Sequence, residues 1–307
     1  MEQVTAVIPS YGKEELTRGA VARLREQTLR PAEVVVVDDG AGVPYTGGNG
    51  ERVLRHERNR GFAAAVNTGV RGCQTPLVAV LNNDVTLEPD WLERLVSVIS
   101  GEGVDFACGK LFRPDGLIDG TFDLVSRGGL SWRAGSGRAD GPLWSTGRRV
   151  QFTSFTAVVA KREGLELDES YESYYEDVEW SLRAAILNKT GYFEPAAGGV
   201  HVGSATAGAW SAYSTRQILR NQRRLARQYL LPEYGAAYRV ARMLLQGQCL
   251  QHGRWPEVPE EAVAVKERGA RLGSILKESE QLLYALQEES GMDRLWRWYF
   301  RLAGRMA

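Results

Sequence analysis

The stretch that decides the fold is Leu77-Val78-Ala79-Val80-Leu81-Asn82-Asn83-Asp84, in which an apolar run ends in two amides and a carboxylate. A short apolar run bounded by turn residues is typical of a buried strand in a parallel sheet. Open α/β sheets bind ligands at the carboxyl ends of their strands. Oxygen-rich side chains there suit a hard divalent cation that also binds substrate phosphates. A simple turn is the alternative, because Asn and Asp side chains also bond their own backbone.

Strand and helix patterns alternate through the first hundred residues around this stretch. Apolar, β-branched runs predict strands at 4–8, 34–37, 52–55 and 77–81. Apolar residues at helical spacing predict helices at 16–30, 62–70 and 91–99. Such alternation predicts a mostly parallel sheet with right-handed crossovers, flanked by helices.

The pattern changes after residue 105. Strands are expected at 106–112, 151–160 and 192–195, and a helix at 174–188. Residues 113–149 show little periodicity and are long enough to be a functional loop. After residue 211 the pattern is helical, with segments at 213–230, 234–250, 260–289 and 292–302.

These patterns predict two parts of the chain. An α/β domain is expected over residues 1–210, with a nucleotide-binding half at 1–100 and an acceptor or catalytic half at 101–210. A helical extension is expected over residues 211–307.

Composition excludes some classes of protein. Thirty-eight basic and 38 acidic residues give zero formal charge, so no nucleic-acid partner is expected. Cys73, Cys108 and Cys249 are isolated, which argues against a disulfide framework and favours a reducing compartment. Residues 1–10 lack the features of a signal peptide, and no apolar run reaches the ~20 residues of a membrane span. We expect a cytoplasmic protein, with the inner face of the plasma membrane as the surface for any membrane contact.

Two other strand ends carry polar residues. Asp38 and Asp39 end the second strand, where carboxylates can accept hydrogen bonds from a base or from ribose hydroxyls. An Asp-Gly turn is an equal alternative. The first strand ends in Pro9-Ser10-Tyr11-Gly12 without a G-x-G-x-x-G motif, which disfavours a nicotinamide dehydrogenase. The phosphates of a bound nucleotide would then be held elsewhere, and a metal at Asp84 would hold them.

Three further residues could carry chemistry. Glu176 and Asp177 open a helix pattern, and neighbouring helix residues point about 100° apart. We therefore expect one of the two acids to be the chemical group and the other to be structural, although acids in a first turn also favour the helix dipole. We interpret Glu179 with Arg183 as a stabilising i,i+4 pair. His201 lies between glycines and could be a metal ligand, although a lone His is more often a satisfied polar residue.

The helical part carries two basic features. Four arginines share one helix face, at positions 216, 220, 223 and 227. They predict either a solvated face or contact with phosphate or anionic lipid. Residues 292–305 mix aromatic residues with arginines, which predicts either a peripheral membrane anchor or packing on the main domain.

Six short motifs, in this order, resemble those of the inverting GT-A glycosyltransferases of family 2. Within that family the chain resembles the bacterial rhamnosyltransferase-type branch. The motifs are Val7-Ile8-Pro9-Ser10-Tyr11, Val36-Val37-Asp38-Asp39-Gly40, Asn59–Gly69, Asn82-Asn83-Asp84, Glu176-Asp177 and His201-Val202-Gly203-Ser204. Each motif is weak alone, but their order over residues 3–225 is specific.

The resemblance implies a hexosyl donor of the nucleotide-diphospho-sugar class, with deoxythymidine-diphospho-rhamnose as the leading candidate. The implied donor-binding residues are Pro9, Ser10, Tyr11, Asp38, Asp39, Gly61, Phe62, Asn67, Asn82 and Asn83. The resemblance also implies that Asp84 binds Mg²⁺ or Mn²⁺ on the diphosphate and that His201 completes the metal shell. Asp177 would be the general base, beside Glu176. From the arginine face and the aromatic segment at 292–305 we expect the acceptor to be a saccharide or lipid-linked hydroxyl in cell-surface glycan synthesis.

Two other interpretations stay open. A nucleotidyltransferase would need a glycine-rich, basic loop after the first strand, where this chain has Pro9-Ser10-Tyr11-Gly12. A non-catalytic sugar-nucleotide-binding module would keep the fold without the chemistry, and Asn82 in place of an acid fits that hypothesis.

Overall fold

The computed structural model describes residues 3–48, 50–203, 210–255, 257–258 and 261–305. Ser204 of the last motif and Glu260 at the start of an expected helix lie outside these residues.

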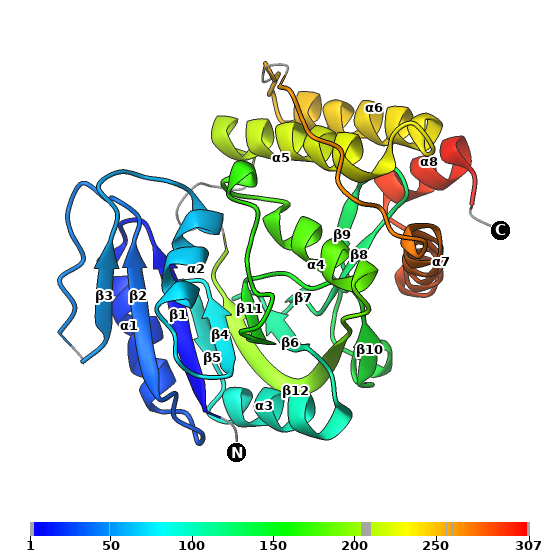
Figure 1. The fold of residues 1–307 in the computed structure, drawn as a ribbon. Helices are drawn as coiled ribbons and strands as arrows, with labels where there is room; N and C mark the ends of the chain where they lie inside the picture. Colours follow the sequence, from blue (N-terminus) through cyan, green and yellow to red (C-terminus); the bar gives the residue numbers. More distant parts are fainter. Residues whose placement is uncertain (1–2, 49, 204–209, 256, 259–260, 306–307) are drawn as a thin grey trace.

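In the described part of the chain, ten strands form one mixed sheet (Figure 1). Its main path is β10-β12-β6-β11-β4-β1-β2-β3, with β5 paired to β12 and β7 to β6. The strands are β1 (Val4–Ser10), β2 (Glu33–Asp38), β3 (Arg52–Arg55), β4 (Leu77–Leu81), β5 (Val85–Leu87), β6 (Phe106–Phe112), β7 (Ile118–Gly120), β10 (Arg148–Val150), β11 (Ala157–Lys161) and β12 (Gly191–His201). A separate hairpin consists of β8 (Asp123–Val125) and β9 (Ser131–Arg133).

The parallel half of the sheet sets the place of the ligand site. Strand β1 is parallel to both β2 and β4, and β2 is parallel to β3. The strand order therefore reverses at β1, and the carboxyl ends of β1, β2 and β4 lie along one edge. Such a switch point is where open α/β sheets bind their ligands.

Helices cover both faces of the sheet because the strand residues alternate between two apolar clusters. Ala6 and Ile8 face α1 (Glu14–Arg25) and α3 (Trp91–Glu102), as their shared cluster shows. Val7 faces the other way, in a cluster with residues of α2 (Phe62–Arg71) and α4 (Glu176–Ile186). All five residues of β4 are buried, as its apolar sequence predicts.

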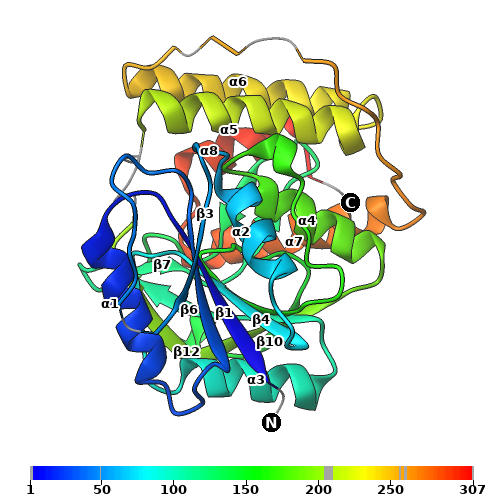
Figure 2. The ribbon, with the colours of Figure 1, turned by 60° about the vertical axis from the view of Figure 1, so that its left-hand side comes forward.

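The later helices pack against the α4 side of the sheet. They are α5 (Ala212–Leu225), which continues as a π-helical turn over Ala226–Leu230, α6 (Gly235–Gln251), α7 (Leu272–Ser290) and α8 (Arg294–Ala303). Figure 2 shows α5 and α6 side by side across one end of the molecule. Val178 and Leu182 of α4 share an apolar cluster with Tyr229 and Leu276. The helical extension is therefore packed into the same core as the α/β domain.

Several expected elements differ from the structure. The strand expected at 151–160 is shorter, because β11 begins only at Ala157. Residues 113–149, which were expected to be a loop, contain the sheet strand β7 and the two hairpin strands β8 and β9. They also contain a 3₁₀ helix at Pro142–Trp144 and the start of β10. The strand expected at 192–195 extends to His201 within β12. The helix expected at 260–289 begins only at Leu272, because Lys266 binds Asp168 and Glu179 and its backbone N–H binds the Gln228 carbonyl. Tertiary contacts override helix propensity in that segment.

The C-terminal aromatic segment packs on the domain. Trp296, Tyr299 and Phe300 of α8 are buried, and only Trp298 among its aromatic side chains is largely exposed, at 41%. The structure thus realises the packing alternative for these three side chains. No helix of the described residues combines the length and the apolar character needed to cross a membrane.

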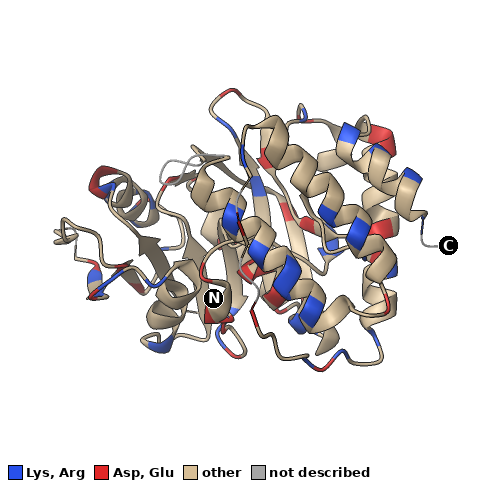
Figure 3. Ribbon diagram, turned by 90° about the horizontal axis from the view of Figure 1, so that it is seen from above, with Lys and Arg blue, Asp and Glu red and all other residues tan. Residues whose placement is uncertain are grey.

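The predicted arginine face is partly occupied by contacts within the chain. Figure 3 shows basic positions recurring along the helices on this side of the molecule. Arg220 binds Glu172 and Glu261, at 3.1 and 2.6 Å. Arg223 donates to the Val258 carbonyl, and Arg227 to that of Glu261. These arginines therefore hold a neighbouring segment, whereas Arg216 is exposed.

Glu179 connects α4 to the later helices. Its side chain is fully buried and accepts hydrogen bonds from Arg183 at 3.1 Å, Tyr229 at 2.6 Å and Lys266 at 2.9 Å. The predicted pair with Arg183 is thereby confirmed. Burial opposes ionisation of Glu179, but the Arg183 hydrogen bond and the charge of Lys266 outweigh it and lower the pKa of the carboxyl below its usual range.

We expect Glu179→Gln to lower the free energy of unfolding by about 2–3 kcal/mol at neutral pH, because two basic side chains lose their charged partner. A carboxyl with a lowered folded-state pKa stabilises fully above its unfolded-state pKa of about 4.3 and loses that effect as the pH falls through the folded-state pKa. The difference between wild type and variant should therefore vanish in acid. Urea unfolding across this pH range measures it, with exposed Glu15→Gln as control; equal losses in both variants would contradict the prediction.

Candidate active site

A cavity of about 1320 Å³ opens at the carboxyl ends of β1, β2 and β4. Its wall also includes the β8–β9 hairpin, the start of α4 and the start of α8. It brings together most residues that the motifs singled out. These are Pro9, Ser10, Tyr11, Asp39, Gly61, Phe62, Asn82, Asn83, Asp84, Glu176, Asp177 and His201.

Two predicted donor-binding residues, Asp38 and Asn67, lie outside the cavity wall. The buried Asp38 carboxylate accepts hydrogen bonds from the backbone N–H groups of Ala41 and Tyr45, at 3.1 and 2.9 Å, and from Arg55. Asn67 exchanges two hydrogen bonds with the backbone of Leu167, at 2.9 and 2.8 Å. Both side chains hold neighbouring segments in place.

Asp39 lines the cavity and also shapes the turn that follows β3. Its carboxylate accepts hydrogen bonds from the backbone N–H groups of Arg60 and Gly61, each at 2.9 Å, and lies 2.6 Å from His56 Nδ1. Gly61 has a φ of 89°, and a Cβ there would lie 2.8 Å from the backbone of Glu172. Only glycine fits this close approach without strain.

Strand pairing brings His201 to the tip of β4. The antiparallel register of β5 and β12 aligns His201 with Val85, the residue after Asp84. His201 Nε2 then lies 3.2 Å from Asp84 Oδ1, and both side chains are largely buried. Asn83 turns away from this pair and donates to Thr17 Oγ1 at 3.1 Å.

Asp119 and Arg133 extend this pair into a polar network. His201 Nδ1 lies 2.9 Å from Asp119 Oδ2, which also accepts from Arg133 Nη1 at 2.9 Å. Burial disfavours a charged imidazole, but the hydrogen bonds to Asp119 and Asp84 outweigh it and raise the pKa of His201. Burial likewise opposes ionisation of Asp119, yet His201 and Arg133 lower the pKa of that carboxyl.

The pair of Asp84 and His201 fits a divalent cation. A carboxylate oxygen and an imidazole nitrogen face one another, and a second carboxylate, Asp119, holds the other ring nitrogen, as is usual for metal-binding histidines. Within the described residues there is no group of three or more His, Cys, Asp or Glu side chains placed to hold a metal. Two protein ligands are compatible with Mg²⁺-like coordination, in which phosphate oxygens and water fill the remaining positions.

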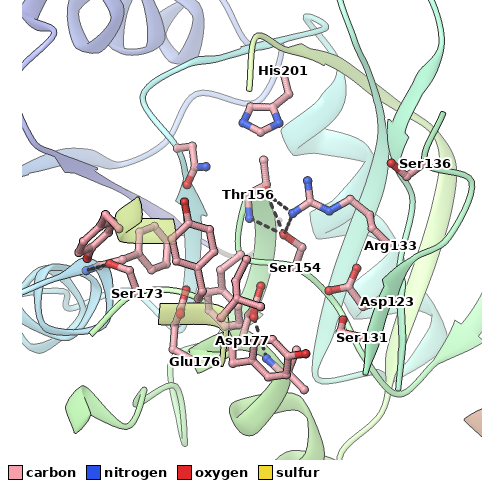
Figure 4. Close-up of a pocket in the computed structure, with 18 of the residues that line it drawn as sticks. Asp123, Ser131, Arg133, Ser136, Ser154, Thr156, Ser173, Glu176, Asp177 and His201 are labelled. Carbon is pink, nitrogen blue, oxygen red and sulfur yellow. Dashed lines mark hydrogen bonds between the residues drawn. The ribbon is translucent and has the colours of Figure 1, made fainter. Parts of the chain in front are cut away.

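The two acids at the start of α4 both contribute to the cavity wall (Figure 4). The residues before them have positive φ values, of 60° at Glu172, 68° at Tyr174 and 71° at Tyr175. Non-glycine residues rarely adopt this conformation, and a cluster of them is typical of functional sites. The strained turn directs the helix start into the cavity.

Glu176 and Asp177 differ in their surroundings. Glu176 Oε2 has no hydrogen-bond partner among the described residues, and burial followed by the charge of Asp177 raises the pKa of Glu176 well above its usual range. Asp177 Oδ1 accepts from the Val178 N–H at 2.8 Å. Burial raises the pKa of Asp177 as well, although Arg133 opposes that change. The structure therefore favours a proton on Glu176 and the negative charge on Asp177.

Sequence reasoning missed Asp119, Asp123 and Arg133, which all lie in the stretch that was expected to be a loop. Arg133 Nη2 donates to Ser154 Oγ at 2.7 Å and Thr156 Oγ1 at 2.9 Å (Figure 4). The signal that could have found these residues is the recurrence of Asp and Arg among glycines and tryptophans at 113–149.

The first part of the chain matches a known protein family. Residues 5–126 match the model of Glycosyl transferase family 2. The matched residues include Asp39, Asp84, Asp119 and Asp123, and the match ends before the α4 acids. A pre-mycofactocin glycosyltransferase of Mycobacterium tuberculosis is 39% identical over 99 residues, which are 30% of this chain and 20% of that protein. The chain thus spans only a fifth of that relative's length.

Two solved structures align with almost the whole chain, whereas the family model matches only residues 5–126. GalNAc-T7, solved with UDP, GalNAc and Mn²⁺, has a TM-score of 0.64 at 16% identity, covering 98% of this chain and 56% of its own. Mannosyltransferase PcManGT from Pyrobaculum calidifontis, solved with GDP-Man and Mn²⁺, has a TM-score of 0.55 at 15% identity, covering 97% and 86%. At these identities the likeness shows the fold, and the predicted GT-A α/β architecture with C-terminal helices is confirmed.

We expect Asp119→Asn to weaken Mn²⁺ binding about 10–100-fold, because His201 loses the carboxylate that orients its ring. Mn²⁺ alone is the probe, and the electron paramagnetic resonance signal of the free ion measures binding without any assay of activity. Asp115→Asn is the matched control, since exposed Asp115 accepts a hydrogen bond from the Leu117 N–H that Asn can also accept. Equal affinities in the two variants would contradict the role of Asp119.

Proposed function

We propose that this protein is an inverting, metal-dependent glycosyltransferase that moves a sugar from a nucleotide-diphospho-sugar to an acceptor hydroxyl. The observation that carries the proposal is the meeting of two chemistries in one cavity. One is the facing pair of Asp84 and His201, and the other is the strained helix start that presents Asp177. The family 2 match and the GT-A fold support it.

The donor half of the site would lie at the strand tips. Pro9, Ser10, Tyr11, Asp39, Gly61, Phe62, Asn82 and Asn83 line it there. Asp84 and His201 would hold Mg²⁺ or Mn²⁺, which when bound neutralises charge on the departing nucleoside diphosphate. Mn²⁺ accompanies UDP and GalNAc in one structure with a similar fold and GDP-Man in another, which supports this choice.

The acid pair would serve the acceptor. Asp177 would accept the proton of the attacking hydroxyl, and its raised pKa makes it a stronger base near neutral pH. Glu176 would stay protonated, so that the two neighbouring acids carry one negative charge and not two. A hydroxyl that attacks the anomeric carbon opposite the leaving group, with no covalent intermediate, inverts that centre.

The identity of the sugar rests on the resemblance of the motifs, and the acceptor class rests on the arginine face and the aromatic C-terminal segment. We retain deoxythymidine-diphospho-rhamnose as the leading donor and a saccharide or lipid-linked acceptor of cell-surface glycan synthesis. Contact with the cytoplasmic face of a membrane would use the exposed side of α8, where Trp298 lies beside Arg301.

Asp177→Asn should lower the rate of sugar transfer by about 10²–10⁴-fold while donor affinity stays unchanged, because only the proton acceptor is removed. Glu176→Gln should cost less, since the amide imitates the neutral acid. Single-turnover transfer and calorimetric donor binding measure the two effects, with Asp115→Asn as control. Unimpaired turnover in Asp177→Asn would remove this residue from the mechanism.

A thermal-shift panel of nucleoside diphosphates and their sugars, with and without Mn²⁺, should identify the donor as the compound that stabilises the protein only with metal. Wild type should then release nucleoside diphosphate from that donor in a metal-dependent manner, and the Asp84→Asn variant should not. Metal-dependent binding without any release would favour the non-catalytic module instead.

A further inference from the structure

We infer that Asp123 binds a hydroxyl of the acceptor, in a subsite built for a sugar ring. The inference rests on the proposed function, which it deepens by naming the acceptor class and the residue that selects it. Asp123 lies on β8 opposite Arg133 of β9, and both residues line the cavity. Figure 4 shows it between Arg133 and Ser131.

The carboxyl of Asp123 is buried with part of its bonding capacity unused. Asp123 is only 5% exposed, and its Oδ1 atom has no hydrogen-bond partner among the described residues. The guanidinium of Arg133 donates instead to Asp119, Ser154 and Thr156. An unpaired buried carboxyl oxygen is costly, so a ligand hydroxyl that pairs with it would gain the bond and remove the cost.

Asp123 is also electrostatically coupled to the proposed base. Burial raises the pKa of Asp123 to about 7, Arg133 opposes this, and the charges of Asp177 and Asp119 add to it. The charge of Asp177 therefore affects the pKa of Asp123 within the same cavity. A ligand with several hydroxyl groups could present one to Asp177 for reaction and another to Asp123 for binding.

The rest of this wall fits a sugar better than a simple alcohol. Ser131, Ser136 and Ser154 contribute hydroxyl groups, and Trp132, Trp210 and Trp296 contribute aromatic surface. A sugar ring has apolar C–H faces and a hydroxyl edge, and it thus matches a cavity that combines aromatic walls with a few polar groups. The hairpin supplies Ser131 and Trp132, and α8 supplies Trp296.

The test uses full-length protein, the donor identified above and a set of p-nitrophenyl glycosides as acceptors. At pH 8, where Asp123 is ionised, Asp123→Asn should raise the KM for the best glycoside about 10-fold, because a neutral amide oxygen replaces the charged acceptor and the hydrogen bond weakens. Asp123→Ser, whose short side chain loses the bond, should raise it about 10–100-fold. The kcat of Asp123→Asn for that glycoside, its donor affinity and its release of nucleoside diphosphate to water should stay within twofold of wild type. Asp115→Asn should match wild type in every assay.

A second comparison uses deoxygenated analogues of the best glycoside. One analogue should lose more affinity for wild type than for Asp123→Asn and none for Asp123→Ser, because the missing hydroxyl is the partner of Asp123. Quenching of tryptophan fluorescence by these glycosides reports binding without turnover. Thermal unfolding checks that the variant is folded, and Asp123→Ser repeats the test with a smaller side chain.

Three results would overturn the inference. The first is an unchanged KM in both Asp123 variants. The second is a parallel loss of donor hydrolysis and of transfer in these variants. The third is a wild-type protein that releases nucleoside diphosphate but neither binds nor glycosylates any glycoside. Failure of the proposed function is a different result, namely no metal-dependent release from any donor.

Discussion

The pairing of β5 with β12 is the constraint on which the site depends. Strand β5 continues directly from the Asn82-Asn83-Asp84 tip, and β12 ends at His201, so their antiparallel register places an acid and an imidazole from distant parts of the chain against one another. Because β12 is also parallel to β6 in the middle of the sheet, this junction is fixed on both sides. A shift of one residue in the register would turn His201 to the other face of the sheet.

Burial of several acids in one cavity requires a balance of charge. Arg133 supplies much of it, since it bonds Asp119 and lowers the pKa that Asp123 and Asp177 would otherwise have. Gly120 leaves room for this arginine, because a Cβ there would lie 2.1 Å from Arg133 Cδ. A hairpin that sequence periodicity does not reveal thus supplies the charge that opposes the effect of burial on the pKa of Asp177.

Local pattern was enough to predict the parallel half of the fold. Contiguous sequence alone shows the apolar run of β4, the helical spacing of apolar residues in α2 and the polar residues at the strand tips. Sequence patterns did not predict Asp119, Asp123 and Arg133, because their strands are only three residues long. The positions of these strands depend on pairing, of β7 with β6 and of β8 with β9. The prediction of a helix at 261–271 was wrong for a similar reason, since Lys266 forms ion pairs with acids from other segments. The proximity of His201 to Asp84 was inferred from motifs and not from any local signal.

The position of α8 in the sequence has a consequence for biosynthesis. Trp296 and Arg294 complete one wall of the cavity, although they are made after every strand of the sheet. A nascent chain that has already assembled the sheet would therefore present the strand tips and the strained start of α4 through an open side. Closure of that side would occur only after α8 has been made and docks, so the cavity is completed later than the sheet.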